Sequence, residues 1–191
     1  SDIIVAVLDH GTQLGHPDLN VSSKSYDTET GRSPSQIWGN HGTACSGIIS
    51  AKTNNNLGVA GIAPNCPVMS ISNQLMGTSD APQKRADGFN WAWRNGASVI
   101  SNSWRSSTFS ELLEDAIQSA MTNGRNGLGC VVTFSAGNYD SNTVGYPARS
   151  LPDIIVVGAL SLSGKRKSST TIDNEGWWGS DYGTQLDIMA P

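Results

Sequence analysis

Five short apolar runs, each rich in β-branched residues, constrain the fold of this 191-residue chain more than any other feature. They cover residues 3–8, 68–72, 97–101, 130–134 and 153–157. The first run, Ile-Ile-Val-Ala-Val-Leu, has no polar residue, which is typical of a strand buried on both faces of a parallel sheet. The intervals between the runs are long enough for helices or long loops. The sequence therefore predicts an α/β fold with a mostly parallel sheet.

Three segments between these runs have helical patterns. Residues 41–51 are rich in small side chains, and residues 83–95 and 111–123 carry apolar residues at helical spacing. The last two segments end at Asn-Gly, a common helix stop. Strands that alternate with helices predict a three-layer, doubly wound sheet. Ligands bind such sheets outside the carboxyl ends of the strands, and Asp9 and Asn138 both closely follow predicted strands.

The composition bounds the class of protein. A hydrophobic content of 37% and a charged content of 15% suit one globular domain over residues 1–191. The formal net charge of −4 provides no basic surface for phosphates, so we expect no nucleic-acid partner. No stretch approaches the roughly 18 consecutive apolar residues of a membrane span, and the first residues lack the basic start of a signal peptide. The three cysteines, Cys45, Cys66 and Cys130, lack CxxC spacing, so each is expected to be a small buried residue.

Three polar residues stand in strings that suit peptide hydrolysis by a serine. That chemistry requires a base for the serine proton, a carboxylate that orients the base, and donors for the oxyanion. Asp9 precedes His-Gly-Thr-Gln-Leu-Gly-His-Pro-Asp-Leu, His41 opens His-Gly-Thr-Ala-Cys-Ser-Gly, and Asn138 ends Ser-Ala-Gly-Asn. Taken singly, each has a plainer reading: Asp9 as a turn residue, His41 as a capping or surface histidine, and Asn138 as a left-handed turn residue.

The series of strings resembles the subtilase family of serine peptidases. The family has an Asp box, a His-Gly-Thr box and an Ala-Gly-Asn oxyanion loop in this order. Further matching strings are Gly-Val-Ala-Gly-Ile-Ala-Pro at 58–64, Ser-Asn-Ser-Trp at 101–104, Gly-Tyr-Pro-Ala at 145–148, Ile-Val-Val-Gly-Ala at 155–159 and Asp-Ile-Met-Ala-Pro at 187–191. One such string is weak evidence, but a series in one order is specific. The resemblance covers the whole chain and implies a subtilisin-like fold.

The resemblance implies a role for each candidate residue of the catalytic site. Asp9 would be the orienting carboxylate, His41 the general base and acid, and Asn138 the side-chain donor to the oxyanion. We expect the function of a serine endopeptidase that works through an acyl-enzyme on polypeptide substrates.

The family's nucleophile lies in the string Gly-Thr-Ser-Met-Ala-Pro, which comes after the Ala-Pro string where residues 1–191 end. The sequence therefore predicts a truncated peptidase domain that lacks its serine and is inactive alone. Ser79 stands in Gly-Thr-Ser-Asp-Ala-Pro but precedes Asn138, out of the family's order. Asp80 and Gln83 there predict a capping box at a helix start, so Ser79 is not assigned as the nucleophile.

Substrate contacts follow from the same resemblance. The family's Ser-Trp-Gly segment, which pairs with the substrate backbone, corresponds to Ser103, Trp104 and Arg105, and Gly145 would line the first specificity pocket. Arg105 departs from the family because it replaces a glycine, so its guanidinium either crowds the cleft or offers a charge to an acidic residue of the substrate. His10 replaces a small hydroxyl residue beside the predicted catalytic carboxylate.

A calcium site is also implied by the resemblance. Many family members bind a calcium ion between a loop after the histidine helix and the Asp of the His-Pro-Asp-Leu string. Here Asp18, Asn55 and the carbonyls of Thr53, Leu57 and Val59 occupy the matching positions, and oxygen ligands suit Ca²⁺. The alternative is an Asn-rich turn beside a solvated Asp18, because a lone acidic ligand binds calcium weakly.

Two other functions compete with an active peptidase. The first is a pseudopeptidase that acts as a binding or regulatory module, for which the departures at His10 and Arg105 would be the signs. The second is an α/β hydrolase of another family, which the absence of a Gly-x-Ser-x-Gly nucleophile elbow disfavours. The resemblance further implies a propeptide, or the remaining carboxyl-terminal part of the domain, as a partner, and secretion or cell-surface display as the location.

Overall fold

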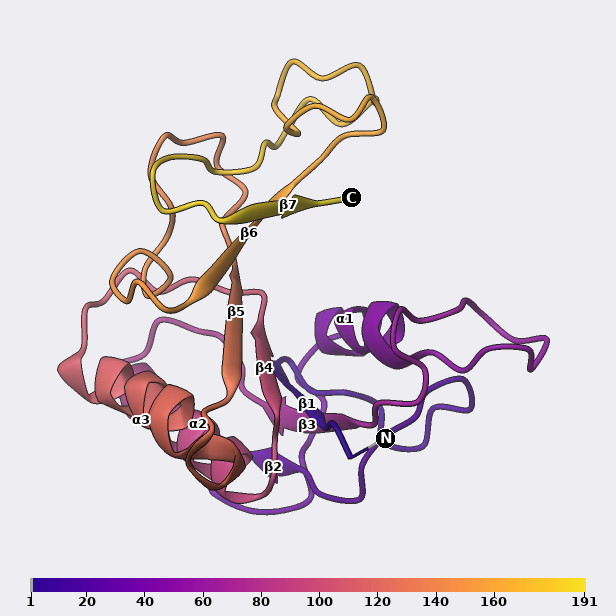
Figure 1. Ribbon diagram of the computed structural model, residues 1–191, viewed down its shortest axis with the longest axis vertical. Coiled ribbons are helices and arrows are strands. Elements are labelled where there is room, and N and C mark those ends of the chain that lie inside the picture. Colours follow the sequence, from indigo (N-terminus) through magenta and orange to yellow (C-terminus); the bar gives the residue numbers. More distant parts are fainter. Residues whose placement is uncertain (1) are drawn as a thin grey trace. The chain divides into compact units, whose positions relative to one another are not determined.

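The computed structural model describes residues 2–191, which form two compact units. Of the described residues, the first unit comprises 2–102 and Ser110–Val132, and the second comprises Ser103–Phe109 and Thr133–Pro191. Each unit contains part of a parallel β-sheet (Figure 1).

The first unit is built on four parallel strands. These are β1 (Val5–Asp9), β2 (Tyr26–Asp27), β3 (Val68–Ser72) and β4 (Val99–Asn102), in the order β2-β3-β1-β4. Every residue of β1 and β3 is buried, so the apolar run at the start of β1 is covered on both faces of the sheet. The chain passes from β3 on one side of β1 to β4 on the other. The carboxyl end of β1, at Asp9, therefore lies at a topological switch point, where sheets of this kind hold their ligands.

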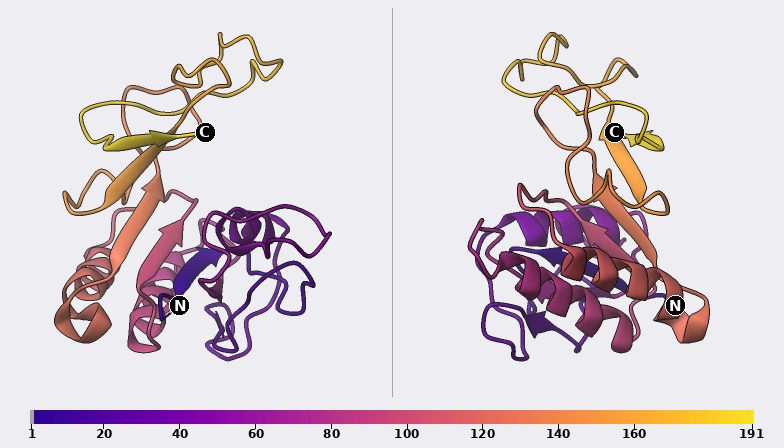
Figure 2. Two further views of the ribbon diagram at one scale, coloured as in Figure 1. Left: turned by 45° about the vertical axis from the view of Figure 1, so that its right-hand side comes forward. Right: turned by 90° about the vertical axis from the view of Figure 1, so that its left-hand side faces the viewer.

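Helices cover both faces of this sheet. Figure 2 shows α1 (His41–Ser50) on one face and α2 (Ala81–Arg94) with α3 (Glu111–Gly127) on the other. Phe89 of α2 and Ile117 of α3 are both fully buried, as their helical spacing predicts. The resulting arrangement has three layers.

The second unit holds the remaining strands. β5 (Val131–Ser135) begins in the first unit and continues into the second, where β6 (Ile155–Ala159) and β7 (Ile188–Ala190) follow in the parallel order β5-β6-β7. Long loops form most of the rest of this unit (Figure 1). Trp104 packs edge to face on Phe134, with ring centroids 5.0 Å apart, and both side chains are buried.

The predicted fold class is confirmed, because seven parallel strands combine with helices on both faces of the sheet. All five predicted strands have ends within two residues of the observed ones. The predicted helix stops are also correct: α2 ends at Arg94, and the helical backbone of α3 is interrupted at Gly124. β2 and β7 were not predicted, since two or three residues are too few to give a periodic pattern.

The predicted capping box at the start of α2 is wrong. Asp80 precedes α2 but caps no backbone N–H; its carboxylate instead pairs with Lys84 at 2.8 Å, while Gln83 Nε2 donates to Asp87. A lysine one turn away thus competes successfully for the predicted capping carboxylate. Ser79 lies in an exposed turn before this helix.

The cysteines differ from one another in burial. Cys130 is buried, and its thiol donates to the carbonyl of Ala97 at 3.1 Å. Cys45 and Cys66 are only half-buried, so the prediction of three buried cysteines is wrong for these two. None of the helices formed by residues 2–191 has both the length and the apolar character that a membrane crossing requires.

Candidate active site

Asp9 and His41 meet within hydrogen-bond distance in the first unit. Asp9 is the last residue of β1 and is 1% exposed, whereas His41 is the first residue of α1 and its side chain is 52% exposed. Nδ1 of His41 lies 2.9 Å from both carboxylate oxygens of Asp9. An ionised carboxylate only accepts, so Nδ1 carries a hydrogen, and in the neutral imidazole Nε2 then has the lone pair. This arrangement lets Nε2 act as a base.

Small residues bring these two groups together. A Cβ atom on Gly42 would lie 2.5 Å from the carbonyl oxygen of Gly11, so α1 can approach the turn after β1 this closely only with glycine at position 42. The hydroxyl of Ser46 donates to the carbonyl of Gly42 at 2.7 Å and lies 2.7 Å from the hydroxyl of Thr12. The small residues of α1 thus let the helix pack closely against the turn that follows β1.

His10 adds a second contact to the buried carboxylate. Its backbone N–H donates to Asp9 Oδ1 at 2.7 Å, and its ring Nδ1 lies 3.9 Å from the same oxygen. The rings of His10 and His41 are edge to face with centroids 6.3 Å apart. Asp9 therefore has a backbone donor besides the imidazole, which reduces the cost of burying its charge.

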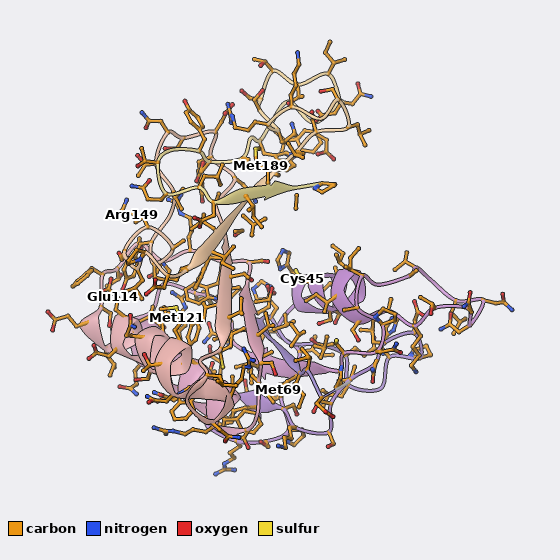
Figure 3. All side chains as sticks on the ribbon, viewed as in Figure 1. Cys45, Met69, Glu114, Met121, Arg149 and Met189 are labelled. Atoms are coloured by element: carbon orange, nitrogen blue, oxygen red, sulfur yellow. The ribbon has the colours of Figure 1, made fainter. Side chains whose placement is uncertain are left out.

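Cys45 lies on α1 (Figure 3). It follows His41 by one helical turn. Its sulfur is 3.7 Å from Nδ1 and 4.0 Å from Nε2 of the imidazole. Asp9, His41 and Cys45 each offer a ligand atom within 4.8 Å of the others. The proximity of Cys45 to His41 was missed in the sequence, although His and Cys four residues apart on a predicted helix share a face.

Asn138 belongs to the second unit, on an exposed loop three residues beyond β5. The buried carboxylate of Asp181 clamps this loop. Its Oδ1 accepts from the backbone N–H groups of Tyr139 and Ser141, both at 2.9 Å, and its own N–H donates to the carbonyl of Gly137. Gly137 has φ +118°, and a Cβ there would overlap Asp181 Oδ2, so glycine is required. No sequence motif singles out Asp181.

Asp140 anchors the same loop from a second side. Its Oδ2 accepts from the backbone N–H and hydroxyl of Ser169 at 2.9 and 2.8 Å, and its Oδ1 accepts from Arg166 at 2.6 Å. The N–H of Ser169, together with the guanidinium of Arg166, lowers the pKa of Asp140 to about 2. The segment that carries Asn138 is therefore held by two hydrogen-bonded carboxylates.

The predicted substrate-binding residues also lie in the second unit. Trp104 is 6% exposed, so only its backbone remains for the predicted pairing with substrate. Arg105 and Gly145 are neighbours, because a Cβ on Gly145 would lie 3.1 Å from Cβ of Arg105. Ser103 is half-buried, directly after β4.

Asp18 and the loop predicted to bind calcium are in contact. Asp18 is 4% exposed and accepts from Asn55 Nδ2 at 2.7 Å and from the N–H of Val59 at 3.2 Å. The Asn55 hydrogen bond is the largest cause of the lowered pKa of Asp18. Asp18 is thus not the solvated residue of the alternative reading. The oxygen set suits Ca²⁺, but here the carboxylate accepts N–H groups, and Asn55 Oδ1 accepts from the N–H of Leu57. Coordination would require Asn55 to turn its amide oxygen toward the ion.

Comparison with known proteins identifies the family. The sequence profile of the subtilase family matches residues 1–191. Subtilisin NAT of Bacillus subtilis subsp. natto is 34% identical over 197 aligned positions, which cover 100% of this chain and 47% of that protein. Subtilisin of Bacillus pumilus is also 34% identical, covering 100% of this chain and 65% of the relative. The chain thus spans about half to two-thirds of the length of these curated relatives.

Solved structures agree in fold. The structure of MycP1 with its N-terminal propeptide removed has a TM-score of 0.75 and 23% identity, covering 99% of this chain and 64% of the other. The prenylagaramide maturation protease PagA has a TM-score of 0.71 and 26% identity, covering 100% of this chain and 63% of the other. Because the family profile matches the whole sequence and these structures share its fold, the chain belongs to the subtilase family.

Proposed function

We propose that this chain forms the acid–base part of a serine endopeptidase that cleaves polypeptides through an acyl-enzyme. The observation that carries this proposal is the 2.9 Å contact between His41 Nδ1 and the buried carboxylate of Asp9. It orients the imidazole and fixes its tautomer, as a catalytic histidine requires.

In this mechanism Nε2 of His41 takes the proton of the attacking serine and later gives it to the leaving amine. Asp9 stabilises the imidazolium that forms between these steps. The amide of Asn138 donates to the oxygen that becomes charged in the tetrahedral intermediate. Its loop is anchored by Asp140 and Asp181, so the donor needs little reorganisation when the charge develops.

The serine is the part of this mechanism that residues 1–191 do not contain in the family's string. We infer that the nucleophile of the active protein lies outside these residues, and that residues 1–191 alone are inactive. Ser79 lies in an exposed turn, and it precedes Asn138 in the sequence, whereas the family's serine follows the corresponding asparagine.

Family membership also supports the remaining proposals. Polypeptides are the proposed substrate, and a propeptide or the rest of the peptidase domain is the proposed partner. We propose secretion or cell-surface display as the location and Ca²⁺ at Asp18 as a structural ion.

The test uses the natural protein that contains this chain, assayed on casein and with a serine-directed fluorophosphonate probe. His41→Ala should lower turnover by about 10⁴-fold or more, because the serine loses its base. Asn138→Ala should cost about 10²–10³-fold in turnover and leave KM nearly unchanged, a range established on a subtilisin asparagine. His16→Ala is the control, since the His16 ring accepts from the N–H of Asp18 and is outside the proposed catalytic site. Full activity of the His41→Ala protein would refute the mechanism.

A pseudopeptidase remains the second candidate, favoured by Arg105 in place of glycine and His10 in place of a small hydroxyl residue. The same probe separates the two. A folded natural protein that binds peptides but is neither labelled nor active on casein would be a pseudopeptidase.

A further inference from the structure

The side chain of Arg105 occupies the space above Gly145. A Cβ on Gly145 would lie 3.1 Å from Cβ and 3.4 Å from Cδ of Arg105, so the aliphatic stem fills the room that a side chain at position 145 would take. The backbone beside it is fixed, because the N–H of Ser106 donates to the carbonyl of Tyr146 at 2.8 Å. The side chain of Arg105 thus reduces the space beside Gly145.

One face of the Arg105 guanidinium is stacked on the ring of Tyr139. Its Cζ lies 3.9 Å from the centroid of the Tyr139 ring, and its Nη1 lies 3.9 Å from Asp181 Oδ2. Within residues 2–191 it makes no hydrogen bond to accompany these contacts, and the side chain is 46% exposed. A planar cation stacked on a ring therefore keeps its N–H edges available to an incoming group.

Asp181 explains why the cation stays in this position. Asp181 is fully buried, and among the described residues no hydrogen-bond donor reaches its Oδ2. A buried carboxylate oxygen without donors is costly unless a cation faces it, and Arg105 supplies that cation. The other oxygen, Oδ1, already accepts hydrogen bonds from two backbone N–H groups. Asp181 therefore attracts the Arg105 guanidinium by its charge across 3.9 Å, but it does not accept a hydrogen bond from the guanidinium N–H groups.

We propose that Arg105 makes this protein select substrates with an acidic side chain, Asp or Glu, at the residue before the cleaved bond. The proposal rests on the proposed peptidase function, which assigns Gly145 to the first specificity pocket. A guanidinium edge matches a carboxylate through two charge-assisted hydrogen bonds. A large apolar side chain would instead displace water from a cation and collide with the stem above Gly145.

The test compares peptides that differ only at this residue: Glu, its neutral isostere Gln, and Leu. The natural protein should cleave and bind the Glu peptide roughly tenfold better than the Gln peptide, because the Gln amide keeps one acceptor oxygen and loses one of the two charge-assisted hydrogen bonds. Arg105→Gln keeps a stem but removes the charge, so the Glu preference should vanish without a gain for Leu. Arg105→Ala should lose the preference and also improve the Leu peptide. Arg94→Ala is the matched control, because Arg94 also lies over a ring, that of Trp93, on α2.

Two readouts separate the proposals. Hydrolysis and fluorophosphonate labelling report the peptidase function, whereas calorimetric binding of the same peptides reports the subsite whether or not they are cleaved. Cleavage with equal Glu and Gln values, or a Glu preference that survives in Arg105→Gln, would overturn the subsite. Binding that prefers Glu in a protein that cleaves nothing would support the subsite and refute the peptidase.

Discussion

Replacement of Gly42 by alanine tests how closely the geometry of Asp9 and His41, the proposed catalytic pair, depends on helix packing. The new Cβ would lie 2.5 Å from the carbonyl oxygen of Gly11. Carbon–oxygen contacts in proteins are rarely shorter than about 3.3 Å, so α1 would have to retreat by about 0.8 Å. His41 is the neighbouring residue, and a retreat of that size would lengthen its 2.9 Å contact with Asp9 to about 3.7 Å, beyond a hydrogen bond.

Two losses should follow from this displacement. Overpacking costs about 1–3 kcal/mol of unfolding free energy, offset by about 0.5–1 kcal/mol that alanine gains over glycine inside a helix. We expect the Gly42→Ala protein to be less stable by roughly 1–2 kcal/mol and slower in turnover by about 10²-fold, as misplaced catalytic groups commonly are. Denaturant unfolding and peptide hydrolysis by the natural protein measure the two effects.

Gly47→Ala is the matched control on the same helix. A Cβ there meets only Leu19 Cδ2, at 4.0 Å, which is an ordinary contact. This change should be neutral or stabilising by up to about 1 kcal/mol and should leave turnover intact. If Gly42→Ala behaves like Gly47→Ala in both assays, the close approach of α1 does not position His41, and the reasoning is wrong.

Three further predictions concern ions and protons. If calcium binds at Asp18, the melting temperature should rise as free Ca²⁺ passes its dissociation constant, and Asp18→Ala should abolish the rise; equal melting in chelator and in millimolar calcium would leave Asp18 as a loop anchor only. The pKa of Asp140 is lowered from 3.8 to about 2 on folding, so its stabilising effect is fully present above pH 3.8 and is lost as pH falls through 2. Acid unfolding of Asp140→Asn should therefore show a weaker pH dependence between pH 4 and 2, and an unchanged slope would contradict this. Finally, Cd²⁺ should inhibit the peptidase by binding Cys45 with His41, and inhibition that persists in Cys45→Ala would exclude this site.

The parts of the fold that the sequence predicts are those with local, periodic causes. β1 and α1 each carry a pattern that their own residues determine, and the end of β1 and the start of α1 supply Asp9 and His41. These two residues are 32 positions apart, yet a strand end and a helix start at one switch point suffice to bring them together. The predicted roles of both residues depended on the order of motifs, since neither is distinctive alone.

In the second unit, the sequence does not predict the contact between Arg105 and Asp181. Arg105 and Asp181 are far apart in sequence and stand in segments without regular secondary structure. No periodicity relates them, and an Asp in a loop is ordinarily solvated. Only the tertiary path of the chain brings the buried Asp181 to the loop of Asn138 and to the guanidinium of Arg105. The sequence shows that Arg105 replaces the family's glycine, but it does not show that Asp181 is the counter-charge of Arg105.

One carboxylate in this unit therefore serves two neighbouring elements. Oδ1 of Asp181 holds the backbone around Asn138, whereas Oδ2 faces Arg105. Because both oxygens belong to one buried group, we expect a shift of the guanidinium on binding an acidic side chain to act on the carboxylate that clamps the loop of Asn138. In the proposed peptidase, recognition of the residue before the cleaved bond and placement of the Asn138 donor are thus joined through a single side chain. An arginine at position 105 without a buried partner at 181 would be a mobile surface cation with neither effect.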